Sequence, residues 1–308
     1  MGAKRHHYLP ECYLRQFAVG DFVSLFDRAQ KEVRRQHVHN TAVVGHLYSI
    51  HRDDGSKDPR IEEMLADVDG MIPVVTKQLE ERVPISTDLR SELAFLAALM
   101  LVRVPDYRAG VERVSEKLAR RFIESSYSSV EALRASVEEW QREDPTTSKD
   151  VDVEGMFRVF QTCKIRVNPN EALRLMLDMI PSLAESFFGL DTVVLHTSED
   201  NAFLTCDRPL VTMPRLDSSG KAIGSVGILS PGSRQYLPLS NTITVVFADR
   251  GTGFLHADAP RPVVKGVNAA VTQFTDRFLI GRDVALVSAW ARRGRLAETE
   301  PIGGMDLL

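Results

Sequence analysis

The period at which apolar residues recur changes along the chain, and this restricts the fold more than any other feature of the sequence. Residues 22–28, FVSLFDR, alternate between apolar and polar side chains, which is typical of a half-buried strand. Apolar residues then recur at helical spacing from residue 61 to residue 188, and short β-branched segments return after residue 190. Because strands and helices come in separate blocks, the sequence predicts an α+β fold rather than a strict alternation of strands and helices.

Each block predicts its own part of this architecture. The segments FVSLFDR, EVRRQHVHN and HLYSI predict a small N-terminal antiparallel sheet, and the apolar run LAFLAALMLV at 93–102 predicts a buried helix, packed by the helices before and after it, in a central helical block. Short segments after residue 190 predict a C-terminal mixed or antiparallel sheet closed by two helices. We expect helices at residues 60–83 with a kink at Pro73, 107–125, 130–143, 153–164, 170–188, 265–277 and 283–293. We also expect a helix in STDLRSELAFLAALMLVRVP at 86–105, which begins with a Ser or Thr cap and stops at Pro105. We expect strands at residues 191–198, 202–206, 209–214, 225–230, 234–240 and 242–249.

The domain organisation follows from the length and from one polar segment. At 308 residues the chain is long for one compact core. The segment EDPTTSKDVD at 143–152 predicts a flexible connection. We therefore expect one α+β domain over residues 1–308 with two lobes. Residues 1–145 would hold the N-terminal hairpin and helices, and residues 150–308 would hold further helices and the larger sheet.

Composition excludes several classes of protein. The net charge of −4 gives no general attraction to nucleic acid or to an anionic membrane, so a nucleic-acid contact would need a local basic patch. Three widely spaced cysteines, Cys12, Cys163 and Cys206, predict reduced thiols. The start of the chain lacks the apolar core of a signal peptide, and the most apolar run is about half the length that spans a bilayer. These features predict a cytoplasmic protein with no membrane partner.

The segment KRHHYLP at residues 4–10 concentrates groups that titrate, donate hydrogen bonds or bind metals. Adjacent residues of extended backbone point to opposite sides, so His6 and His7 would not serve one centre together, and Tyr8 would lie on the side of His6. A neutral imidazole can act as a base or a metal ligand near pH 7, and Lys4, Arg5 and Arg15 can hold an anion. The alternative is a structural segment in which a histidine is hydrogen-bonded to the protein body.

A second histidine pair lies in HVH at residues 37–39. On a strand, both imidazoles would share one face and could chelate a metal ion. The alternative is that the pair marks the polar face of a solvated hairpin.

Three further positions are candidates for a polar site. Asp207 follows a short apolar strand in NAFLTCDRP, where it could bind a ligand or a metal, or form a turn with its own backbone. Arg103 ends the most apolar helix, where it could bind a carboxylate or phosphate in a cleft, or reach the solvent. Glu62 lies two helical turns before Asp69 on one helix face, which is either solvated or part of the same cleft.

The segment KRHHYLPECYLRQFA resembles the opening of a large, mostly bacterial family of domains of unknown function, which begins Lys-x-His-His-Tyr-x-Pro and continues Tyr-Leu-Arg-x-Phe. The later segments GHLYSI, IEEMLADVD, LVRVPDYR, FLTCDRPLV, YLPLS and VNAAVTQFTDRFLIG are similar in kind and order. The family usually has Ser-Asp-Asn-Pro where this chain has Cys206-Asp207-Arg208-Pro209, and Glu is commoner at the position of Asp69. The resemblance therefore carries over Asp207 but not its neighbours. It implies that the separated segments form one site, and it implies no particular reaction.

We therefore expect a metal-dependent, nuclease-like hydrolase of phosphoesters, of the kind found in bacterial defence or toxin systems. The candidate catalytic residues are His6, His7, Tyr8, Asp207 and Glu62. A divalent metal ion would be held among His6, His7, Glu62 and Asp207. An anionic substrate, with nucleic acid among the candidates, would be bound by Lys4, Arg15 and Arg103. The alternatives are a non-catalytic binding or sensor module for an anionic small molecule or peptide, and a structural scaffold with a satisfied polar core.

Overall fold

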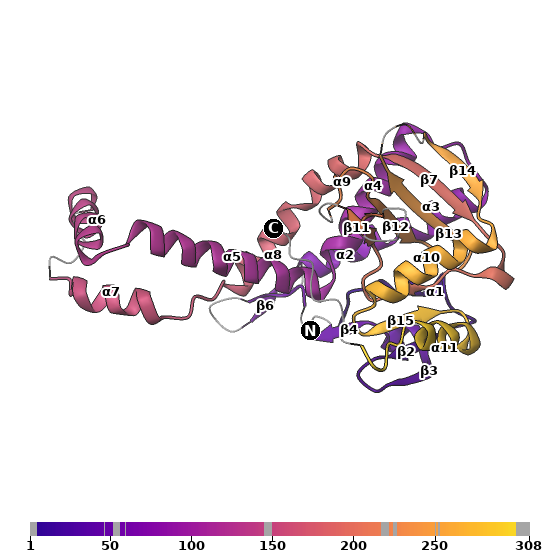
Figure 1. Ribbon diagram of the computed structural model, residues 1–308, viewed down its shortest axis with the longest axis horizontal. Coiled ribbons are helices and arrows are strands. Elements are labelled where there is room, and N and C mark those ends of the chain that lie inside the picture. Colours follow the sequence, from indigo (N-terminus) through magenta and orange to yellow (C-terminus); the bar gives the residue numbers. More distant parts are fainter. Residues whose placement is uncertain are drawn as a thin grey trace.

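The strands and helices of the protein form the α+β architecture that the sequence predicts (Figure 1). The structure is a computed structural model that describes residues 5–45, 47–51, 56–58, 60–144, 150–216, 222–223, 227–249, 251 and 253–299. It has a helical block, a small antiparallel sheet near the start of the chain, and two larger sheets built mostly from later residues.

The first of the larger sheets has five strands in the order β14-β7-β13-β12-β9. Its strand β14 runs parallel to β7, and the other neighbours are antiparallel, so the sheet is mixed. All six residues of β13 are buried, as expected for a central strand that is covered on both faces. The strands are β7 (Asp191–His196), β9 (Val211–Met213), β12 (Arg234–Pro238), β13 (Ile243–Ala248) and β14 (Leu255–Asp258).

The second larger sheet joins the two ends of the chain. The N-terminal hairpin pairs through β2 with a strand near the C-terminus, which pairs in turn with β8, giving the order β3-β2-β15-β8. Two C-terminal helices, α10 (Arg261–Phe274) and α11 (Val284–Arg293), pack against it, as the sequence predicts for its last two helices. The strands are β2 (Phe22–Asp27), β3 (Glu32–His37), β8 (Thr205–Cys206) and β15 (Phe278–Gly281).

The small N-terminal sheet has a different membership from the one expected. Strand β1 (Arg5–His7) pairs antiparallel with β4 (Val43–Gly45), whereas the hairpin of β2 and β3 belongs to the four-stranded sheet. Within HLYSI, the strand residues that the structure describes are Ile50 and His51, which form β5 and pair with β6 (Lys57–Asp58). The expectation of one sheet from these three segments was wrong, because the hairpin gains a partner from a strand about 250 residues away.

The core helix is the predicted one. In α4 (Thr87–Val102), every residue of the apolar run at 93–102 except Phe95 is buried, and the Ser86 hydroxyl accepts a hydrogen bond from Leu89 N. Its main partner is α9 (Ile180–Phe188) rather than the helices before and after it. A helix about 80 residues away in sequence therefore covers this apolar surface.

Two helices that were expected to be single are divided. The segment 60–83 holds two helices, α2 (Arg60–Asp69) and α3 (Met71–Glu80). The break between them is at Gly70 and not at Pro73. Pro73 lies in the first turn of α3, where its missing N–H removes no helical hydrogen bond. Residues 170–188 form α8 (Pro169–Asp178) and α9, with Pro181 in the first turn of the second. In both cases the proline lies in the first turn of a new helix and bends none.

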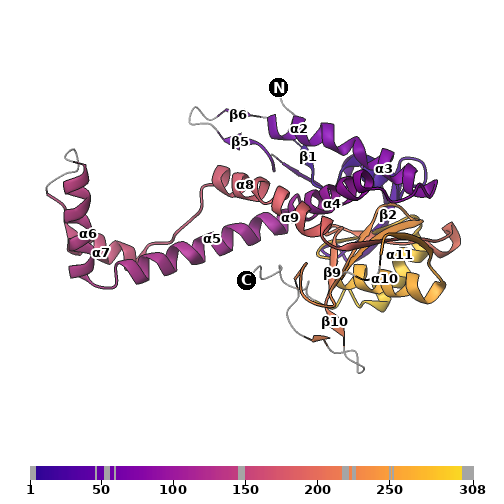
Figure 2. The same ribbon diagram turned by 90° about the horizontal axis from the view of Figure 1, so that it is seen from above.

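Three helices extend away from the rest of the molecule (Figures 1 and 2). Helix α5 (Pro105–Ser126) forms the stem of this arm, and α6 (Val130–Glu143) and α7 (Val153–Thr162) lie at its far end. The two end helices share a small core of their own, made of Leu133, Val137 and Val153.

Some expected elements differ in the C-terminal half. Residues 227–230 of the segment 225–230 form a turn and not a strand, and residues 225 and 226 lie outside the described residues. The strands β14 and β15 were not expected, although β15 has no polar side chain and is buried throughout. The division into lobes around residues 145–150 stays a prediction, and residues 145–149 are not described.

Among the described residues, no helix combines the length and the apolar character needed to cross a membrane.

Candidate functional site

The two adjacent histidines of β1 have different surroundings, as the sequence predicts. His6 pairs across the small sheet with Val44, and its side chain is 1% exposed. Its Nδ1 accepts a hydrogen bond of 3.1 Å from Tyr48 N, and its ring stacks on the Tyr48 ring. His6 therefore fits the structural alternative, in which an imidazole is hydrogen-bonded to the protein body.

Arg103 belongs to the same buried network. Its guanidinium, 2% exposed, forms an ion pair with Asp69 and donates to His7 O at 3.1 Å, while the Tyr48 hydroxyl donates to Arg103 O. Burial disfavours the charge, and the neighbouring Tyr48 and Asp69 more than offset this, so that the pKa of Arg103 is raised. The guanidinium thus binds a carboxylate in the protein interior and ties β1 to α2 and α4.

His7 lies close to two other potential metal ligands. One ligand atom from each of His7, Glu11 and His39 lies within 4.8 Å of the others. His39 Nδ1 is 3.2 Å from a carboxylate oxygen of Glu11. The ring centroids of His7 and His39 are 5.8 Å apart. His7 and Glu11 are half-buried and the His39 side chain is 67% exposed, so the cluster is open to solvent on one side. We call these three residues the HEH cluster.

Local structure brings the HEH cluster together from three segments. Pro10 ends the extended segment and precedes α1 (Glu11–Arg15), so Glu11 is the first residue of a short helix. Strand β3 ends at His37, and residues 38–40 form a turn of 3₁₀ helix that redirects His39 toward Glu11. The expectation that His37 and His39 share a strand face was wrong, because His39 N donates to His37 Nδ1 across this turn.

Arg15 lies beside the HEH cluster and apart from the buried network of Arg103. Its guanidinium pairs with Glu11 at 2.7 Å and also with Asp21. Burial raises the pKa of Glu11, but Arg15 and His39 together outweigh it, so the pKa of this carboxyl is lowered. Asp21 and Glu11 in turn raise the pKa of Arg15. Arg15 therefore orients the Glu11 carboxylate.

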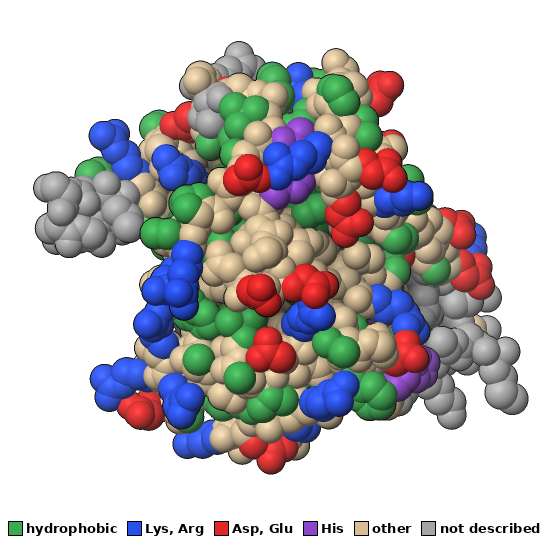
Figure 3. All heavy atoms as spheres, turned by 90° about the vertical axis from the view of Figure 1, so that its right-hand side faces the viewer, with side chains coloured by type: hydrophobic (Ala, Val, Ile, Leu, Met, Phe, Trp, Pro, Cys, Tyr) green, Lys and Arg blue, Asp and Glu red, His purple; other side chains and the backbone are tan. Residues whose placement is uncertain are grey.

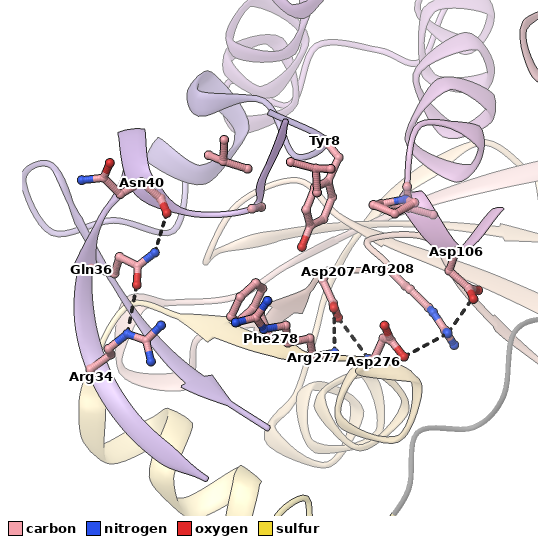
Figure 4. Close-up of a pocket in the computed structure, with 15 residues that line it drawn as sticks. Tyr8, Arg34, Gln36, Asn40, Asp106, Asp207, Arg208, Asp276, Arg277 and Phe278 are labelled. Carbon is pink, nitrogen blue, oxygen red and sulfur yellow. Dashed lines mark hydrogen bonds and ion pairs between the residues drawn. The ribbon is translucent and has the colours of Figure 1, made fainter. Parts of the chain in front are cut away.

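Tyr8 and Asp207 line a separate pocket of about 420 Å³ (Figure 4). The wall near Arg34 carries a second guanidinium, Arg277, and both pair with Asp27, whose side chain is fully buried. At the other wall Arg208 lies between Asp106 and Asp276, at 3.1 and 3.3 Å. Residues 104–106, which follow Arg103 in the chain, also line this pocket, so the pocket adjoins the buried network of Arg103.

Asp207 has an unusual environment for a carboxyl group. Its two oxygens accept hydrogen bonds from Asp276 N at 3.0 Å and Arg277 N at 2.7 Å. Burial, with the nearby Asp276, raises its pKa to about 7, although the backbone donors favour the ionised form. Burial and the Asp207 charge also hold the pKa of Tyr8 well above its usual value. Asp207 is thus a carboxyl group that titrates near neutral pH inside a pocket.

The structure brings the expected site residues together in three neighbouring places. His6 and Arg103 form the buried network, His7 belongs to the HEH cluster with Arg15 beside it, and Tyr8 and Asp207 line the pocket. Lys4 and the side chain of Glu62 lie outside the described residues. The roles assigned to these residues stay predictions.

The fold and the site together define an α+β protein with an HEH cluster and a polar pocket that both adjoin its N-terminal strand. A family model matches residues 5–284, and the chain belongs to that family, described as a protein of unknown function and designated DUF4238. Neither the comparison with curated proteins nor the comparison with solved structures gives a significant match.

Sequence reasoning missed several residues that the structure places in these sites. Glu11 carries a weak signal, because it follows Pro10 at the first turn of a helix and precedes Arg15 by four residues. Tyr48, Asp106 and Arg277 carry none, since their partners come from distant segments.

Proposed function

We propose that the protein is a hydrolase of phosphoesters that uses a divalent metal ion held by His7, Glu11 and His39. The proximity of these three ligand groups is the observation that carries the proposal. Two imidazoles and one carboxylate are the protein ligands of several catalytic zinc sites, where a remaining position holds water or substrate. A zinc ion in such a site lowers the pKa of the bound water toward 7 and so supplies a nucleophile.

The residues around the HEH cluster support this use. The solvent-facing side of His39 gives a substrate access to the ion. Arg15 holds the Glu11 carboxylate, which is the kind of outer contact that orients a metal ligand. The bonds of Arg103 to His7 O and Asp69 hold the backbone of β1, so that His7 is presented from a fixed strand. In this proposal His7 is a ligand, whereas His6 and Arg103 position it.

Zinc titration by calorimetry of the metal-free protein tests the site. We expect one zinc ion per chain, and binding at least about tenfold weaker in His39→Gln, because even an outer-shell change costs about 10–100-fold in affinity. His39 is largely exposed, so its replacement should leave the fold intact. The control is His256→Gln, which changes a histidine bonded to His196 and to Val83 O, outside the HEH cluster.

Turnover of bis(4-nitrophenyl) phosphate with Zn²⁺, Mn²⁺ or Mg²⁺ tests the activity. We expect hydrolysis by the unchanged protein and by His256→Gln, and a loss of at least about tenfold in His39→Gln. Equal zinc affinity in both variants would contradict the site. Zinc binding without turnover under any of these metals would contradict the hydrolase and favour the binding module.

A further inference from the structure

A groove on the arm concentrates basic side chains. It has a volume of about 610 Å³ and lies between α5 and the segment that follows α7. Five cationic side chains and one carboxylate, Glu116, line it. The cations are Arg113, Lys117, Arg120, Lys164 and Arg166. The groove is therefore strongly basic within a chain whose net charge is −4.

The geometry of the groove is fixed by one of these cations. Arg120 donates to Phe160 O at 2.6 Å and to Cys163 O. These bonds hold the segment after α7 against α5, so that Lys164 and Arg166 face the same groove as the α5 side chains. Arg113, Lys117 and Arg120 recur at four and three residues, which places them on one face of the helix over about 10 Å at 1.5 Å per residue.

The other four cations have no acidic partner in the part of the chain that the structure describes. Arg113, Lys117, Lys164 and Arg166 are exposed, and none lies within 4.0 Å of a carboxylate of the described residues. Elsewhere, arginines such as Arg134, Arg174 and Arg208 pair with one or two carboxylates. On the face of the molecule opposite the arm, basic and acidic side chains are mixed (Figure 3). The charge of the groove is thus left uncompensated.

We propose that this groove binds the phosphate backbone of a nucleic acid. An array of uncompensated cations along a concave surface complements a polymer with regularly spaced phosphates, and arginine suits phosphate because it can donate two parallel hydrogen bonds. The choice of nucleic acid over other polyanions rests on the proposed function, since a phosphodiester polymer would be both ligand and substrate. The arm would then hold the polymer while the HEH cluster acts on it.

Fluorescence anisotropy with labelled 20-nucleotide RNA, single-stranded DNA and duplex DNA, all in EDTA, measures binding without cleavage. We expect saturable binding of at least one of them at 50 mM salt, with affinity that falls steeply as salt rises. The double variant Arg113→Gln/Arg166→Gln should bind at least about tenfold more weakly, and its log–log salt slope should be smaller by about 1.4–1.8. Because both side chains are exposed, the variant should fold normally.

The matched control is Arg121→Gln/Arg158→Gln, which removes the same charge from two exposed arginines of the arm that do not line the groove. Equal weakening in both double variants, or no binding to any of the three nucleic acids, would overturn the proposal. Tighter binding of polyglutamate or of phosphatidylserine vesicles than of nucleic acid would overturn it as well. Hydrolysis of bis(4-nitrophenyl) phosphate separates the two proposals, because the groove variant should retain it and His39→Gln should lose it while still binding nucleic acid.

Discussion

At the scale of single residues, surroundings decide what a titratable group does. His6 and His7 are neighbours with the same side chain, yet one is bonded to Tyr48 N in the interior and the other lies beside Glu11 and His39. Asp207 shows the same dependence, because its burial keeps a carboxyl group protonated at a pH where exposed ones are ionised. This environment makes a prediction about the pH dependence of stability.

Asp207 should make the protein less stable as the pH rises from about 4 to about 7. The pKa of Asp207 is about 7 in the folded protein, against an ordinary value of 3.8. In this window the folded state binds more protons than the unfolded state, so the free energy of unfolding falls with rising pH. In Asp207→Asn this contribution is absent, and the decrease between pH 4.5 and pH 7.5 should be smaller. Urea unfolding of both proteins at the two pH values measures it, and parallel pH profiles would contradict the raised pKa.

At the scale of elements, a side chain can satisfy backbone N–H and C=O groups that lie beyond the end of a short strand. The chain just before β8 is hydrogen-bonded to a side chain of α10. Asn268 of α10, 2% exposed, accepts a hydrogen bond from Leu204 N at 2.9 Å and donates to Ala202 O at 3.0 Å. One amide thus satisfies a buried N–H and a buried C=O, as a neighbouring strand would.

Asn268→Ala should destabilise the protein by about 2–6 kcal/mol, because it leaves two buried polar groups unpaired and each costs about 1–3 kcal/mol. The control is Thr272→Val on the same helix, whose hydroxyl donates to Asn268 O within the helix. That change removes no partner of another element and should cost about 1 kcal/mol or less. Chemical denaturation gives both values, and equal losses in the two variants would show that the link to residues 202–204 carries no special weight.

At the scale of the whole molecule, the far end of the arm and the body have separate apolar cores. Leu133 lies in the small core of α6 and α7, whereas Leu96 lies in the large core of α4, α9 and the sheets, and both are fully buried. The arm has few apolar contacts to lose, so it should open locally at lower free energy than the body.

Leu133→Ala should therefore remove protection from hydrogen exchange in α6 (130–143) and α7 (153–162) and leave residues 93–102 protected. Leu96→Ala should instead lower the stability of the body by about 2–5 kcal/mol, the usual cost of a buried leucine. Hydrogen exchange followed by mass spectrometry distinguishes the two effects. A loss of protection at 93–102 in Leu133→Ala would mean that the arm and the body unfold together.

What the sequence by itself determined was local. The period of apolar residues predicted the α+β class, the helix at 130–143 and a strand at 242–249, of which residues 243–248 form β13, because these depend on spacing and burial along one element. Extended backbone at KRHHYLP predicted that the side chains of His6 and His7 would point to opposite sides, which depends only on the geometry of a strand.

Only the tertiary structure decided which segments meet. The pairing of β2 with β15, the covering of α4 by α9, and the approach of His39 to Glu11 all join residues with no sequence signal for one another. Each depends on long-range packing, which selects partners by the shape and polarity of whole surfaces. For that reason His6 and Arg103, which resemble site residues in the sequence, form a buried network, while Glu11, which carries little signal, lies in the HEH cluster.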